Sequence, residues 1–158
     1  MICVDASLAA KWVFEEEHCR EARTLYRDAL MSSERIVAPA LLPIEVTNIV
    51  RQRVRRVKPP AQQPLSLTEA QEALDRFLAL GIEVTMPSQL HRQALELADA
   101  QGLPAVYDAH YVALAQMLGC ELWTADRHLA DAIRQKLPFV RWIGDYGAAV
   151  NTPSREGA

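Results

Sequence analysis

Two carboxylates lie in stretches whose apolar spacing predicts packed helices. Asp108 lies in VYDAHYVALA, 106–115, where every third or fourth residue is apolar or small. Glu45 lies in PALLPIEVTNIV, 39–50, beside the stripe of side chains that the helical period assigns to the core. A carboxylate buried without a cation or several donors is destabilising, or its pKa shifts until it is neutral. Both acids therefore need partners.

Two further acids follow predicted strands. Asp5 comes directly after ICV at 2–4, and Asp126 follows ELWT at 121–124 after one alanine. Taken singly, each is a good helix N-cap, and the helix dipole would favour the other two acids in the first turns of their helices. These local explanations do not account for four acids in the same kind of position.

The spacing of apolar residues predicts alternating strands and helices. The expected strands are 2–4, 35–38, 82–84, 121–124 and 139–143, and the expected helices are 7–14, 19–31, 41–57, 67–80, 88–101, 106–119 and 127–136. This alternation favours a central, mostly parallel sheet of four to five strands with helices on both faces. SLTE at 66–69 predicts a capping box, and the prolines of PPAQQP at 59–64 end the preceding helix.

The predicted sheet gathers the four acids. Ligands of open parallel sheets bind outside the carboxyl ends of the strands, where helix N-termini also point. Of the Lys and Arg residues, only Arg127 adjoins one of the acids in sequence. Divalent cations would therefore be needed to offset the repulsion among the four carboxylates. Oxygen ligands without Cys or His spacing favour Mg²⁺ or Mn²⁺. Such ions assist phosphodiester hydrolysis by activating and orienting water.

Composition bounds the class of protein. The 158 residues are 50% hydrophobic and 23% charged, with a net charge of −3, which is typical of one soluble domain. We expect that domain over 1–150 and a flexible tail over 151–158. No apolar run approaches a membrane span, and the N-terminus lacks a signal-peptide pattern, so we expect a cytoplasmic protein. The cysteine spacing argues against a disulfide framework, and Cys3 and Cys120 are expected to pack in strands.

Four segments together resemble the PIN-domain nucleases, specifically the VapC-type toxins. They are VDAS with Asp5, APALLPIEVTNIV with Glu45 and Asn48, YDAHYVALA with Asp108, and WTADRHLADA with Asp126. The resemblance spans almost the whole chain. It implies a three-layer α/β/α PIN-like fold, dependence on Mg²⁺ or Mn²⁺, an RNA substrate, and a homodimer held by a VapB-like antitoxin. The four acids become catalytic metal ligands, with Ser7, Thr124 and Asn48 as polar supports.

Two departures from the family pattern concern local geometry. The helix of Asp108 lacks the usual Ser or Thr cap, because Leu103, Pro104 and Ala105 precede it. Pro43 lies inside PALLPIE, where a first helical turn can accommodate it. Neither departure removes an acid.

A basic run is the best sequence candidate for contacting RNA. It comprises Arg51, Arg53, Arg55, Arg56 and Lys58. Arg and Lys neutralise phosphate charge, although the same run is equally consistent with a solvated helix face or with contacts to an antitoxin. His110 and His128 are expected to be bystanders, because each lies two residues beyond an acid and so on another helix face. Trp12 is expected to pack, with base stacking as the alternative.

The leading hypothesis is a metal-dependent endoribonuclease, the toxin of a type II toxin-antitoxin pair. It would cleave the P–O3′ bond with a metal-activated water and leave 5′-phosphate and 3′-hydroxyl ends. One alternative is a PIN-type module that binds RNA or a protein partner with little turnover. A receiver-like phospho-accepting domain is disfavoured, because a lone Asp5 follows the first strand and the last strand carries only Arg141.

Overall fold

A computed structural model describes residues 1–55 and 64–147. They form a five-stranded sheet in the order β3-β2-β1-β4-β5, in which every neighbouring pair is parallel. The strands are β1 (Ile2–Val4), β2 (Ile36–Pro39), β3 (Glu83–Thr85), β4 (Glu121–Thr124) and β5 (Val140–Trp142). Because β1 is central, its carboxyl end, where Asp5 follows, lies between the ends of β2 and β4.

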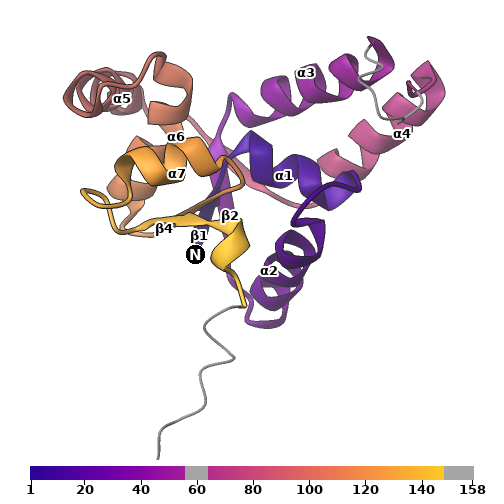
Figure 1. Cartoon of the computed structure of the whole chain (residues 1–158), viewed down its shortest axis with the longest axis horizontal. Coiled ribbons are helices and arrows are strands. Elements are labelled where there is room, and N and C mark those ends of the chain that lie inside the picture. Colours follow the sequence, from indigo (N-terminus) through magenta and orange to yellow (C-terminus); the bar gives the residue numbers. More distant parts are fainter. Residues whose placement is uncertain (56–63, 148–158) are drawn as a thin grey trace, which may run out of the picture.

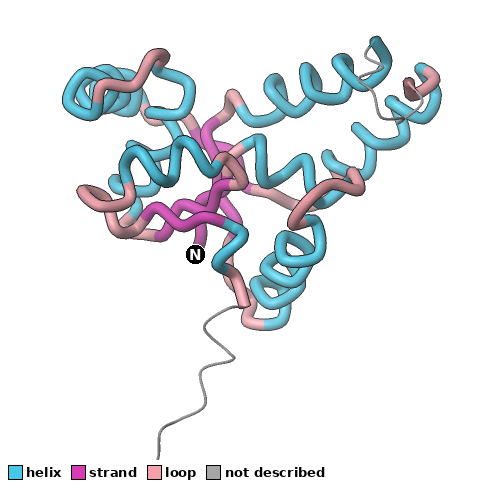
Figure 2. Tube along the Cα trace, viewed as in Figure 1, coloured by secondary structure: helices cyan, strands magenta, loops and turns pink. Residues whose placement is uncertain are grey.

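Helices cover both faces of the sheet. They are α1 (Ala6–Val13), α2 (Cys19–Met31), α3 (Leu42–Arg55), α4 (Leu67–Leu78), α5 (Ser88–Gln101), α6 (Val106–Leu118) and α7 (Arg127–Ile133), followed by the 3-10 turn η1 (Ile143–Asp145). Figure 1 shows α5, α6 and α7 on one side of the strands and α1 and α2 on the other, while α3 and α4 project together from the body. The layers can be followed by secondary structure in Figure 2. The expected three-layer α/β/α fold is confirmed.

The element boundaries follow the sequence pattern closely. The helices predicted at 19–31 and 88–101 agree to the residue, and the predicted helix 41–57 is observed over Leu42–Arg55, with 56–57 outside the described residues. The capping box is present, because Ser66 Oγ accepts from the N–H of Glu69 while Glu69 accepts from the N–H of Ser66. The expected tail, 151–158, lies outside the described residues, so its flexibility stays a prediction.

The core holds α6 close to the sheet. Ala109, Ala113 and Ala115 are at most 1% exposed, and these small side chains let the helix backbone approach the strands. Cys3 is buried in β1 as expected, whereas Cys120 is half-buried one residue before β4. Within the described ranges, no helix is both long and apolar enough to cross a membrane.

Candidate active site

The four acids predicted from the sequence line one cleft at the carboxyl end of the sheet. The cleft has a volume of about 230 Å³, and its walls are Asp5, Ala6, Ser7, Glu45, Asn48, Ile49, Asp108, Tyr111 and Asp126. They come from α1 and its N-cap, from α3 and α6, and from the turn between β4 and α7. The structure thus brings together residues that are separated by up to about 120 positions in the chain, as expected where parallel strands end at one edge.

Asp5 is held by donors on both carboxylate oxygens. It is the N-cap of α1, and its Oδ1 accepts from the N–H of Leu8 at 2.9 Å and from Ser7 Oγ at 2.8 Å. Its Oδ2 accepts from the hydroxyl of Thr124. The capping role that the sequence suggested is therefore real, and it fixes the carboxylate at the floor of the cleft, 5% exposed.

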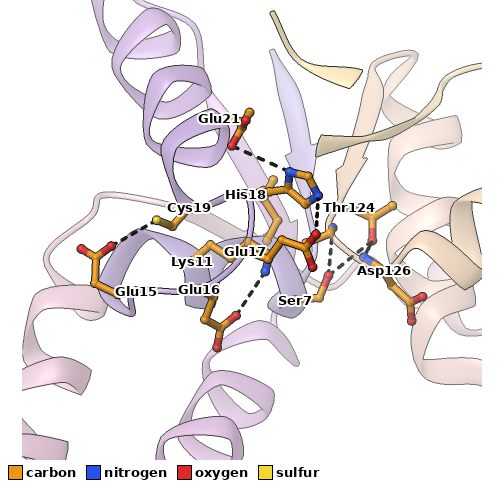
Figure 3. Close-up of polar contacts among 12 residues, drawn as sticks. Ser7, Lys11, Glu15, Glu16, Glu17, His18, Cys19, Glu21, Thr124 and Asp126 are labelled. Atoms are coloured by element: carbon orange, nitrogen blue, oxygen red, sulfur yellow. Dashed lines mark hydrogen bonds and ion pairs between the residues drawn. The ribbon is translucent and has the colours of Figure 1, made fainter. Parts of the chain in front are cut away.

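Ser7 and Thr124 join the first strand end to the turn that carries Asp126. The N–H of Asp126 donates to Thr124 Oγ1 at 2.9 Å, and the N–H of Ala125 donates to Ser7 Oγ at 3.0 Å (Figure 3). Asp126 itself caps α7 by accepting from the N–H of Leu129 at 3.0 Å. Both hydroxyls thus make hydrogen bonds that hold Asp5 and the turn of Asp126 in place, and their support of a metal site stays a prediction.

Glu45 is oriented by a residue that the sequence did not single out. The phenol of Tyr111 donates to Glu45 Oε2, although the two residues lie on α6 and α3. Tyr111 is 1% exposed and also lines the cleft. The available signal was its spacing of three residues from Asp108, which places both side chains on one helix face. Its apolar ring made it look like core only.

Asp108 lacks such support. Across residues 1–55 and 64–147, no donor makes a hydrogen bond to its carboxylate, which is half-buried at the first turn of α6. Burial, and then the charge of Asp126, raises its pKa. The charge of Asp108 in turn contributes to raising the pKa of Asp5 and of Glu45. Asp108 is therefore electrostatically coupled to each of the other three acids.

Burial is the main cause of the raised pKa values at the site. It raises the pKa of Asp5 from 3.8 to about 6, against the opposing effect of its hydrogen bonds from Thr124, Leu8 and Ser7. Burial also raises the pKa of Glu45, which its hydrogen bond from Tyr111 lowers. Perturbed carboxylates that share a cleft are typical of functional sites, because stability alone would favour their replacement.

The cleft suits a hard divalent cation. Its acids offer carboxylate oxygens, and no Lys or Arg of the described residues makes an ion pair with any of the four. Within the described part of the chain, no three His, Cys, Asp or Glu side chains are placed to hold one ion between them. Mg²⁺ commonly binds through one or two carboxylates and retains several waters, so the donor set fits this ion without such a cage.

The residues of the basic run have different environments in the structure. Arg51 is exposed, whereas Arg53 forms an ion pair with Glu16 and lies 4.3 Å above the ring of Phe14. The side chain of Arg55, and Arg56 and Lys58 altogether, lie outside the described residues. Contact with RNA stays a prediction for this run, and Arg53 already has a structural role.

The histidines near the acids lie outside the cleft lining. His110 Nδ1 is 2.6 Å from the carbonyl oxygen of Val106, and its Nε2 is 3.1 Å from Nδ1 of His91 on α5. This pair holds α5 against α6. His128 is exposed on α7. Trp12 packs as expected, since it is 8% exposed and its indole N–H donates to the carbonyl of Ala22.

Comparison with known proteins agrees with the fold. The PIN domain family model matches residues 2–134, so the chain belongs to the PIN domain family. Ribonuclease VapC9 of Mycobacterium tuberculosis and VapC ribonuclease Mb0985 of Mycobacterium bovis are each 28% identical over 139 residues, covering 88% of this chain and 96% of their own length. Ribonuclease VapC3 of Pyrobaculum aerophilum is 32% identical over 130 residues, covering 82% and 92%. The resemblance to VapC-type PIN domains is confirmed.

Proposed function

We propose that this protein is a Mg²⁺- or Mn²⁺-dependent endoribonuclease. The observation that carries the proposal is the convergence of Asp5, Glu45, Asp108 and Asp126 in one cleft, where none of their carboxylates makes an ion pair with a Lys or Arg of the described residues. The names of its relatives, which are ribonucleases, support RNA as the substrate.

The four acids would hold one or two metal ions, and the chain's own hydrogen bonds determine how they do so. Donors to Asp5 and Asp126 fix each of these carboxylates against a helix N-terminus. Tyr111 donates to one carboxylate oxygen of Glu45, which lines the cleft. When bound, the ion would lower the pKa of the attacking water and neutralise charge on the phosphate.

The reaction needs no covalent side chain. Water adds to phosphorus as the P–O3′ bond breaks, one proton of the water passes to solvent, and O3′ leaves and is protonated. The products are a 5′-phosphate and a 3′-hydroxyl. Asn48, an exposed amide at the cleft wall, is placed to donate to a phosphate oxygen. Water has access, because the site is an open cleft.

We propose further that the protein is the toxin of a type II pair, acting in the cytoplasm as a homodimer held by a VapB-like antitoxin. The projecting α3–α4 arm supports an interaction of this kind, because it exposes large apolar side chains. Ile44 is 72% exposed, Leu67 67% and Leu78 58%. Exposed apolar side chains on neighbouring elements mark interaction surfaces.

Cleavage of labelled total RNA tests the enzymatic proposal. Wild type is expected to cut in Mg²⁺ or Mn²⁺ and not in EDTA, and Asp108→Asn is expected to lose at least about 100-fold in rate because it removes a site charge. Asp99→Asn, an exposed aspartate of α5, is the matched control and keeps wild-type activity. No metal-dependent cleavage by wild type, or equal cleavage by Asp108→Asn, would refute the proposal.

A further inference from the structure

An arginine stacked on a tryptophan lies beside the cleft and has no part in holding the acids. Arg127 is the first residue of α7 and follows Asp126 directly. Its guanidinium carbon lies 4.8 Å from the centre of the Trp142 ring. Thr124 and Trp142 are register partners in β4 and β5, so the indole starts at the same strand ends as the site. The stack therefore starts at the same edge of the sheet as the site.

The stack is supported from below and from the side. A Cβ at Gly144 would lie 2.1 Å from the nearest Trp142 ring atom, so only glycine lets the indole rest on this backbone. The ring of His18 contacts Trp142 edge-on, with centroids 5.0 Å apart and an interplanar angle of 79°. His18 itself lies between Glu17 and Glu21 (Figure 3). The indole is thus a fixed platform, and Arg127 is the group that it presents.

The guanidinium keeps most of its donors available. Arg127 is 67% exposed, and its ion pair is a 3.4 Å contact from Nε to Asp131. Arg134 is closer to the same aspartate, at 2.9 Å, and also approaches Asp145 at 3.6 Å. Neither terminal nitrogen of Arg127 makes a hydrogen bond to another of the described residues. A planar cation held on an aromatic face keeps the paired N–H donors that suit phosphate oxygens.

Charge explains why such a group would be placed here. The cleft repels phosphates unless its acids are neutralised, and Arg127 is the cation adjacent to one of them in sequence. A strand of RNA leaving the cleft past Asp126 would meet the Arg127–Trp142 stack next. We propose that Arg127, held on Trp142, binds a phosphodiester of single-stranded RNA next to the scissile one. This inference rests on the proposed function and adds a substrate contact to it.

Binding without cleavage tests the contact. The full chain carrying Asp108→Asn, with Ca²⁺ present so that the remaining acids are neutralised, is titrated with a labelled single-stranded oligoribonucleotide at several salt concentrations. Adding Arg127→Ala is expected to weaken binding about 10-fold and to reduce the slope of log K against log salt by about 0.7, the value for one phosphate contact on a single strand. Arg127→Lys should restore the slope and only part of the affinity, because it keeps the charge and loses the planar stack.

Arg134→Ala is the matched control. It removes the same charge from beside the same aspartate, at the C-cap of the same helix, but Arg134 does not stack on Trp142. With Arg134→Ala, the slope of log K against log salt should equal that of the Asp108→Asn parent. Trp142→Leu should weaken binding, and combined with Arg127→Ala it should add nothing; if this variant does not fold, the two arginine variants still decide.

The possible failures are distinguishable. Equal affinity and slope for Arg127→Ala and Arg134→Ala overturn the Arg127 contact and leave the proposed function intact. No binding of RNA by the Asp108→Asn parent counts against the proposed function, and the Arg127 contact falls with it.

Discussion

The burial of Asp5 makes a quantitative prediction about the pH dependence of stability. Its pKa is raised from 3.8 to about 6, so the folded state holds this proton more tightly than the unfolded chain does. The stability that the protonated group contributes is present below the unfolded pKa and is lost as pH rises through the folded pKa. Relative to low pH, where Asp5 is protonated in both states, its titration lowers the free energy of unfolding by about 1.6 kcal/mol at pH 5 and by about 3 kcal/mol at pH 7. Without metal, the Asp5 contribution should therefore fall by about 1.3 kcal/mol from pH 5 to pH 7.

Asp5→Asn isolates this contribution. The amide oxygen can still accept from the N–H of Leu8, and its NH₂ group can donate to Thr124 Oγ1, which has a second lone pair. Free energies of unfolding are measured by denaturant titration in EDTA at pH 5, 6 and 7. The difference between wild type and Asp5→Asn cancels groups that titrate equally in both proteins.

The difference should change by about 1.3 kcal/mol across that range, in the direction that favours the variant at higher pH. Asp99→Asn should run parallel to wild type. If wild type and Asp5→Asn also run parallel, burial does not hold the Asp5 proton and the reasoning fails.

Three further results are expected. Mg²⁺ should stabilise wild type, by about 2.7 kcal/mol at 100 times its dissociation constant, and should not stabilise Asp108→Asn to the same extent; identical shifts in thermal unfolding would exclude binding at this cleft. Thr124→Val should lower stability by about 1–3 kcal/mol and reduce cleavage, because the N–H of Asp126 and the Oδ2 of Asp5 lose their partner; Thr24→Val, which removes a solvent-exposed hydrogen bond from a half-buried residue, is the control, and equal losses would count against the role of Thr124. Tyr111→Phe should reduce cleavage more than it reduces stability, since it frees Glu45 to rotate; unchanged kcat would show that Glu45 needs no orientation.

The sequence predicted the fold better than it predicted the hydrogen bonds and ion pairs around the site. Strands and helices followed from local periodicity and from caps such as Ser66, which act within a few residues. The four acids were found because they follow strand ends or begin helices. The phenol of Tyr111 was not recognised, because its partner Glu45 lies 66 positions away. Arg53 was predicted to be a candidate for contacting RNA for a similar reason, because its partners Glu16 and Phe14 belong to another segment of the chain.

The central position of β1 has a consequence for synthesis. Asp5 is made before Thr124, but the hydroxyl that binds the Oδ2 of Asp5 belongs to Thr124, on the neighbouring strand β4. A growing chain therefore lacks the turn that carries Asp126 until the four strands that precede it have been translated. For a nuclease made on a ribosome, which is itself RNA, this order of assembly delays activity until β4 and the turn that follows it have been made.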